Sequence, residues 1–166
     1  SRNKAWYRNT SSDVSRVNEY ILNNNIGNSY MYRRLIQKST TTLIDLGANI
    51  GLQSLSLIEE FKSIKKVIGV EPELENYKML VSNYKLWNLK FRQIDFSTIN
   101  GAISHSSDIK LSKVKSLYEL NNKSSASGTF RYQINNEKNP SSFVKAISIQ
   151  DLVDNIPANE KIIIKI

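Results

Sequence analysis

The sequence predicts an α/β fold, in which a parallel sheet carries helices on both faces. Two runs of β-branched and apolar residues, Thr41–Leu46 and 67–70, read as buried strands. Each run is followed by apolar residues at helical spacing, so the order is strand, helix, strand, helix. This order is typical of right-handed βαβ units. Residues 161–166 add another run of the composition that a buried parallel strand has.

Composition limits the class of protein. The chain has 166 residues, of which 40% are hydrophobic and 23% charged, so we expect a single globular domain. Because it has no cysteine, disulfides and thiolate metal sites are excluded, and we expect no metal site. No apolar run reaches the roughly 20 residues of a membrane-spanning helix, and the N-terminal residues do not resemble a secretory signal. We therefore expect a cytoplasmic protein without a membrane partner, and the oligomeric state stays open.

The formal net charge of +8 raises the question of a nucleic-acid partner. The basic residues are scattered in pairs, such as Arg33-Arg34 and Lys65-Lys66, rather than gathered in a run. Arginine, glycine and aromatic residues do not interleave as they do in RNA-binding modules. The charge therefore favours a solvated surface over nucleic-acid binding.

The elements before the first strand are predicted to be helical. Ser12 or Asp13 can cap a helix that has Val14, Val17 and Ile21 on one face. The asparagines at 23–25 end this helix, and a second short helix is predicted over 30–38. A helix over 50–61 follows the first strand, and Leu74 begins a longer one after Glu71-Pro72.

The rest of the chain predicts short strands inserted into the α/β frame. They are expected at 91–94, 98–103, 109–117, 129–134 and 144–149. A short helix begins at 151–153, and 121–128 is a polar loop. Because parallel sheets bind ligands at the carboxyl ends of their strands, a chain that stops after 161–166 is expected to be truncated.

The turn after the first strand reads Gly47-Ala48-Asn49-Ile50-Gly51. In the dinucleotide-binding turn G-x-G-x-x-G, the second glycine lets the backbone approach a pyrophosphate. Asn49 takes that place here and Leu52 takes that of the third glycine, which disfavours NAD and FAD. The Gly-Lys-Ser/Thr ending of a phosphate-binding loop is also missing. A nucleoside ligand without phosphates fits this turn better.

Two carboxylates suit such a nucleoside, S-adenosylmethionine. Glu71 can accept hydrogen bonds from the two ribose hydroxyls, and Asp45 can attract the ammonium of the amino-acid tail directly or through water. Gly47 and Gly51 allow close approach, and Asn49 can cap the next helix or hold the tail. Singly, each residue has an ordinary structural explanation as a turn, a cap or a strand end; the ordered set favours binding.

Several segments resemble one enzyme family. Residues 44–51 look like motif I of class I S-adenosylmethionine methyltransferases. Val70-Glu71-Pro72, with the Glu75-Asn76-Tyr77, Leu80 and Asn83 that follow, is similar to the second motif of the FkbM family. Residues 100–104 resemble its third strand, 146–152 the segment before its fourth strand, and 161–166 that strand, which in the family continues into Asp-x-Glu-Gly.

The resemblance, which covers about residues 39–166, implies a Rossmann-like sheet and an O-methyltransferase acting on a sugar or polyketide-like metabolite. It implies a helical lead-in (1–38), a cofactor-binding βαβαβ unit (39–104), a β-rich insertion (105–160) and a fourth core strand (161–166). The implied cofactor-binding residues are Asp45, Gly47, Ala48, Asn49, Gly51, Glu71, Pro72, Asn100 and Gly101.

No general base is assigned, because the family's acidic motif would begin after Ile166. His105, Asp95 and Asp151 are candidates, although His105 lies in a polar stretch typical of a surface loop. Trp6, Tyr7 and Trp87 can stack on a substrate, with core or helix packing as the default interpretation. Two alternatives stay open: a non-catalytic module that binds a nucleoside or a partner, and a nucleic-acid methyltransferase or binder.

Overall fold

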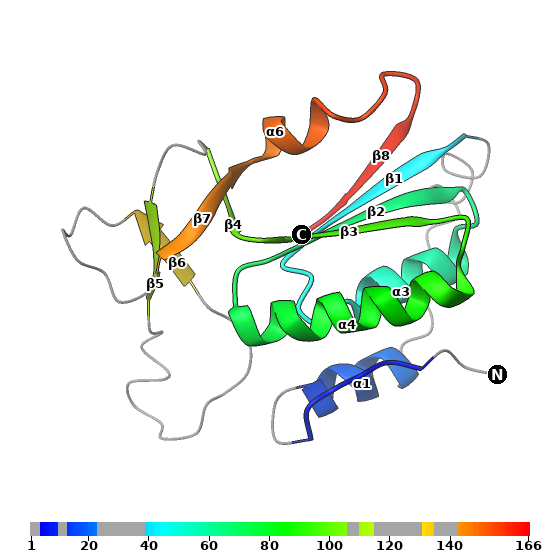
Figure 1. Cartoon of the computed structure of the whole chain (residues 1–166), viewed down its shortest axis with the longest axis horizontal. Helices are drawn as coiled ribbons and strands as arrows, with labels where there is room; N and C mark the ends of the chain where they lie inside the picture. Colours follow the sequence, from blue (N-terminus) through cyan, green and yellow to red (C-terminus); the bar gives the residue numbers. More distant parts are fainter. Residues whose placement is uncertain (1–3, 10–12, 23–38, 106–109, 115–130, 135–142) are drawn as a thin grey trace.

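The computed structural model of the chain describes residues 4–9, 13–22, 39–105, 110–114, 131–134 and 143–166. Within these ranges, four parallel strands form the main sheet in the order β3-β2-β1-β8 (Figure 1). Their bounds are β1 Thr41–Leu46, β2 Ile64–Glu71, β3 Asp95–Asn100 and β8 Lys161–Lys165. The predicted α/β class with a parallel sheet is therefore confirmed, and the arrangement is consistent with a Rossmann-like fold.

The central strands β1 and β2 are apolar on both faces because both faces are covered. Side chains alternate along a strand, so Leu43 and Val67 point into one core while their neighbours Ile44 and Ile68 point into another. Ile44 pairs with Ile68 in the parallel register. This two-sided burial explains why the strands read as nearly continuous β-branched and apolar runs.

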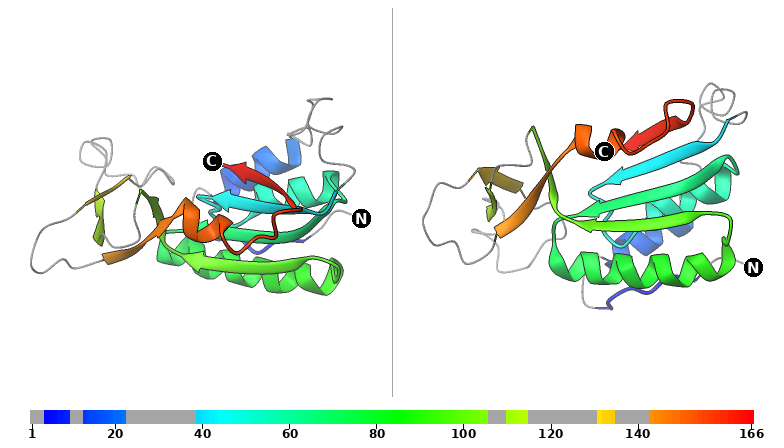
Figure 2. Two further views of the ribbon diagram at one scale, coloured as in Figure 1. Left: turned by 90° about the horizontal axis from the view of Figure 1, so that it is seen from above. Right: turned by 45° about the horizontal axis from the view of Figure 1, so that its top comes forward.

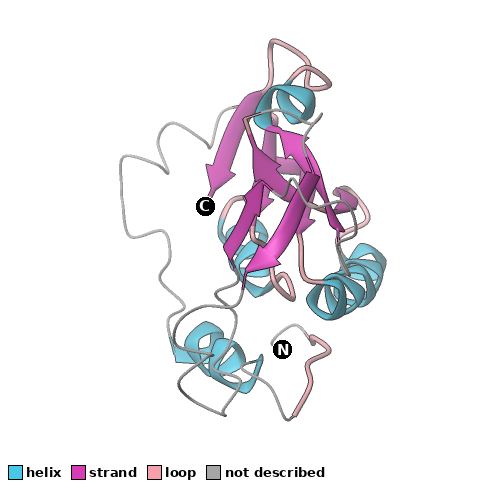
Figure 3. Cartoon of the chain, turned by 90° about the vertical axis from the view of Figure 1, so that its left-hand side faces the viewer, coloured by secondary structure: helices cyan, strands magenta, loops and turns pink. Residues whose placement is uncertain are grey.

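Helices cover the two faces unequally (Figures 1 and 3). On one face lie α3 (Leu52–Glu60) and α4 (Leu74–Lys90), with α1 (Asp13–Leu22) packed against α3. The opposite face is covered by the short helix α6 (Ile149–Val153). The predicted helices are thus present in the described ranges, whereas the helix expected over 30–38 and the loop expected at 121–128 lie outside them.

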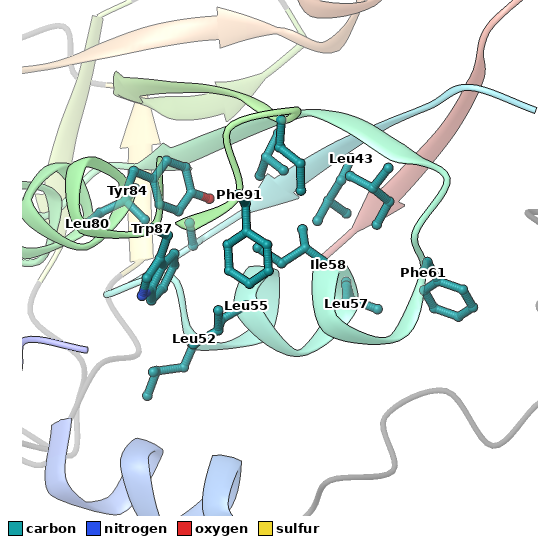
Figure 4. Packing of buried hydrophobic residues seen from close by; sticks show 14 of the residues in the cluster. Leu43, Leu52, Leu55, Leu57, Ile58, Phe61, Leu80, Tyr84, Trp87 and Phe91 are labelled. Carbon is teal, nitrogen blue, oxygen red and sulfur yellow. The ribbon is translucent and has the colours of Figure 1, made fainter. Parts of the chain in front are cut away.

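The larger core fills the space between the main sheet and helices α3 and α4. Burial of each large apolar side chain there contributes about 1.5–3 kcal/mol to stability. The residues labelled in Figure 4 are Leu43, Leu52, Leu55, Leu57, Ile58, Phe61, Leu80, Tyr84, Trp87 and Phe91.

The first described segment, residues 4–9, is attached to α4 by hydrogen bonds. The indole N–H of Trp87 donates to the carbonyl of Lys4 at 2.7 Å. The buried Asn83 amide donates to the carbonyls of Trp6, at 3.0 Å, and Ile50, at 2.8 Å. Trp87 is therefore a core residue, as the default interpretation expected, whereas Trp6 is 61% exposed.

A second sheet accounts for the predicted β-rich insertion. Its order is β4-β7-β5-β6, with bounds Ala102–Ser104, Phe143–Ser148, Lys110–Val114 and Arg131–Ile134 respectively. β4 pairs parallel with β7, while β5 pairs antiparallel with both β6 and β7. Figure 2 shows this sheet beyond the carboxyl end of β3. The chain crosses from one sheet to the other at Gly101.

Three predicted strand assignments are corrected. Residues 91–94 form a turn, in which the N–H of Ile94 donates to the carbonyl of Phe91 at 2.9 Å. The predicted strand 98–103 is divided at Gly101: the third parallel strand is β3, and β4 belongs to the second sheet. Strand β8 was expected to be buried, but β1 is its sole partner among the described strands and Ile164 is 42% exposed.

Candidate functional site

The predicted binding residues meet at one edge of the main sheet. Because the strands are parallel, the carboxyl ends of β1, β2 and β3 lie at the same edge. The register places Leu46 beside Val70 and Glu71 beside Asn100. The turn after β1, the carboxylate that ends β2 and the amide that ends β3 are thus neighbours. We use the name crevice for this edge of the sheet, because parallel α/β sheets bind their ligands there.

The turn at 47–51 is built from left-handed residues. Gly47, Asn49 and Gly51 have φ values of 68°, 53° and 89°. The backbone N–H groups of Gly47 and Ala48 both donate to the carbonyl of Val70, at 2.9 and 3.0 Å. The N–H of Gly51 donates to the carbonyl of Ala48 at 2.8 Å. These bonds fix the turn against β2.

The two glycines of the turn have different roles. A Cβ added at Gly47 would meet no atom within 4 Å, so this glycine faces open space. A Cβ at Gly51 would lie 2.9 Å from Leu80, 3.0 Å from Tyr84 and 3.1 Å from Trp87. Close ligand approach was predicted for both glycines. Gly47 has the open space that such an approach needs, while Gly51 allows α4 to pack closely.

Glu71 connects the turn after β1 to the start of α4. Its carboxylate oxygen Oε2 accepts the N–H of Asn49 at 2.8 Å, and Oε1 accepts the N–H of Glu73 at 2.9 Å. The side-chain amide of Asn76 donates to Oε1 at 3.4 Å. Glu71 is 5% exposed, and this burial raises the pKa of its carboxyl above the ordinary value, an effect that the three hydrogen bonds oppose. Because a carboxylate oxygen can accept more than one hydrogen bond, Oε2 retains acceptor capacity.

Asn100, Gly101 and Pro72 fix the backbone around this carboxylate. The amide of Asn100 donates to the carbonyls of Glu71, at 2.8 Å, and Pro72, at 3.2 Å. The N–H of Gly101 donates to the carbonyl of Glu71 at 3.2 Å. These three predicted site residues therefore lie at the crevice, with Asn100 and Gly101 holding the end of β2.

Asn49 does not cap α3 as sequence analysis expected. The N-cap of that helix is Gly51, and no side chain bonds to the helix start. The reason is geometric: a left-handed residue two positions before the helix does not direct its side chain at the first-turn N–H groups. The buried Oδ1 of Asn49 accepts no hydrogen bond from the described residues. It is therefore an unsatisfied acceptor enclosed at this edge of the sheet.

Asp45 is enclosed and already paired. Ser54 Oγ donates to its Oδ2 at 2.6 Å and lies 2.8 Å from the Tyr84 hydroxyl. Its Oδ1 lies 3.0 Å from Nζ of Lys165, so the two side chains form an ion pair by distance, although this buried oxygen accepts no hydrogen bond from the described residues. Burial, and then repulsion by Asp45, raises the pKa of Tyr84 well above its ordinary value, so this hydroxyl stays protonated.

Lys165 was missed by sequence analysis. It is one of two lysines, with Lys161, that flank three isoleucines in β8, and a charge at the carboxyl end of the strand was the available signal. The structure places its ammonium where the ligand ammonium was expected to lie.

The candidates for a general base lie elsewhere. Asp95 begins β3, at the opposite end of that strand from Asn100. His105 and Asp151 are exposed, after β4 and on α6 respectively. In the described ranges, no three His, Asp or Glu side chains gather as metal ligands, and no helix has the length and apolarity needed to cross a membrane.

The chain is an α/β protein with a parallel sheet. At the carboxyl ends of its strands lie a glycine turn, the buried Glu71 and an Asn49 side-chain oxygen without a hydrogen-bond partner among the described residues. Comparison with protein-family models gave no match, and comparison with curated proteins gave none either. The FkbM resemblance of the sequence motifs therefore stays a prediction.

Proposed function

We propose that the crevice binds S-adenosylmethionine and that the chain belongs to a methyltransferase with the class I sheet. The observation that carries this proposal is the Glu71 carboxylate, held by Asn49, Glu73 and Asn76 beside the open face of Gly47. A carboxylate at the end of the second strand is suited to the paired hydroxyls of a ribose. The buried side-chain oxygen of Asn49, which has no hydrogen-bond partner among the described residues, is a second acceptor beside it.

The backbone of the turn supports a ligand without phosphates. Phosphate-binding loops use free N–H groups. Here the N–H groups of Gly47, Ala48, Asn49 and Gly51 all donate within the protein. Because these N–H groups are engaged, NAD and FAD are poor candidates for this crevice. The charge of Glu71 would repel a 2′-phosphate on the ribose, which disfavours NADP as well.

When bound, S-adenosylmethionine supplies an activated methyl group for in-line transfer to a nucleophile. The contribution of this chain is to position the donor, and positioning alone lowers such barriers by several kcal/mol, up to about 7–11 kcal/mol in the best cases. We propose a hydroxyl of a sugar or polyketide-like metabolite as the acceptor, following the sequence resemblance. We also propose a cytoplasmic location, in keeping with the absence of cysteine.

The proposal is tested by calorimetric titration with S-adenosylhomocysteine, the unreactive product, and with NAD. We expect the wild-type chain to bind the first and not the second. Glu71→Gln should weaken binding at least tenfold, a loss of about 1.4 kcal/mol, because the neutral amide forms weaker bonds to the ribose. Glu75→Gln is the matched control, since it makes the same substitution at an exposed carboxylate on the neighbouring α4. Equal affinities for wild type and Glu71→Gln would refute the ribose role.

A further inference from the structure

The side chain of Lys165 borders the open face of the crevice. Its ammonium lies 3.0 Å from Asp45 Oδ1 and contacts the carbonyls of Leu46 and Gly47 at 3.3 and 3.4 Å. The side chain is 23% exposed, so Lys165 is partly open to solvent. Gly47, whose carbonyl it reaches, is the residue beside which a Cβ would meet nothing within 4 Å. A positive charge therefore stands next to unfilled space.

Asp45 cannot offer its charge to a ligand in this arrangement. It is 0% exposed, one oxygen accepts the Ser54 hydroxyl, and the other is paired with Lys165. A ligand cation that approached the end of β1 would meet the ammonium of Lys165 first and be repelled. An anion would be attracted there.

The ammonium can also reach an anionic ligand without leaving Asp45. It has three N–H donors, and its two contacts with backbone carbonyls are long at 3.3 and 3.4 Å. Exchanging one of them for a carboxylate oxygen replaces a weak contact by a charge-assisted hydrogen bond. The register explains why this lysine stays in place, because Lys165 and Asp45 are direct partners of β8 and β1.

We propose that Lys165 binds the α-carboxylate of an amino-acid-bearing nucleoside, with Asp45 and Ser54 as the residues that position it. The inference rests on the proposed function, since S-adenosylmethionine carries such a carboxylate. From the sequence, Asp45 at the end of β1 was expected to attract the ammonium of the amino-acid tail. In this proposal Lys165 instead binds the carboxylate of the tail at the same place.

The test compares two probes, S-adenosylhomocysteine and 5′-methylthioadenosine, which share the nucleoside thioether and differ in the amino-acid tail. Affinities are measured by calorimetry for wild type, Asp45→Asn and the double variant Asp45→Asn/Lys165→Met. The double variant is used because Lys165→Met alone leaves the Asp45 carboxylate buried and unpaired, which is strongly destabilising. Thermal denaturation of each variant verifies that it is folded.

We expect the wild type and Asp45→Asn to prefer S-adenosylhomocysteine by at least tenfold, because both retain Lys165. The double variant should lose that preference while its affinity for 5′-methylthioadenosine changes less than twofold. A double variant with the wild-type preference would overturn the assignment of Lys165 and leave the proposed function standing. A double variant that binds S-adenosylhomocysteine more tightly than the wild type does would also overturn the assignment, because it would mean that Lys165 occupies the site of the ligand ammonium. A wild-type chain that binds neither probe would overturn both proposals.

Discussion

Replacing Gly51 by alanine tests the packing of the turn against α4. Two costs add in this variant. A left-handed φ of 89° costs alanine about 1–2 kcal/mol, and overpacking against Leu80, Tyr84 and Trp87 costs about 1–3 kcal/mol more. Since one kcal/mol shifts the Tm of a domain of this size by about 2–4 °C, we expect Gly51→Ala to lower the Tm by roughly 4–20 °C.

The matched control is Gly47→Ala, measured by the same thermal unfolding followed by circular dichroism. Its φ of 68° is also left-handed, but no atom lies within 4 Å of the added methyl group. Strain alone then predicts a decrease in Tm of about 2–8 °C. If Gly51→Ala is no less stable than Gly47→Ala, the close approach of α4 does not constrain this turn, and the reasoning is wrong.

Three further predictions concern the network behind the crevice. Arg8→Ala should weaken S-adenosylhomocysteine binding several-fold in calorimetry, because the Arg8 guanidinium donates to Asn76, which in turn donates to Glu71; unchanged affinity would show that the N-terminal segment does not position the carboxylate. Lowering the pH through the raised pKa of Glu71 should weaken the same binding, since the protonated carboxyl loses its charge, and Glu71→Gln should not show this dependence. The effect of pH on the free energy of unfolding has the opposite sign, because burial favours the protonated carboxyl of Glu71. Its stabilising contribution is complete below the ordinary pKa of a glutamate and is lost as the pH rises through the raised pKa of the folded state. Asn83→Ala should lower the free energy of unfolding by about 2–4 kcal/mol in urea denaturation, because its hydrogen bonds to Trp6 and Ile50 are lost and their partners stay partly buried; a loss below about 0.5 kcal/mol would contradict it.

The regular elements around the glycine turn could be predicted from the sequence because local pattern and tertiary burial agree there. β1 was predicted with its observed bounds, and Leu74 does begin α4. The prediction of a strand at residues 91–94 was wrong for a physical reason. Phe91 and Ile94 are apolar like strand residues, but they are buried beneath the end of α4, where the Phe91 N–H donates to the carbonyl of Trp87 at 2.8 Å.

Some residues of the site could be predicted from the sequence and others could not. The turn and Glu71 could be found because each occupies a fixed place after a strand that the sequence shows clearly. Lys165 could not be connected with Asp45, because their pairing depends on the register between strands far apart in the chain. The link from Arg8 through Asn76 to Glu71 likewise depends on how the first segment lies against α4.

Gly101 has a consequence for how this chain can vary. A side chain there would press on Ile147 and come within 2.8 Å of the Lys145 carbonyl, so only glycine lets the main sheet and the second sheet meet so closely. The same residue holds the carbonyl of Glu71 through its N–H. Any substitution at Gly101 would therefore disturb both sheets and the backbone of the glutamate together.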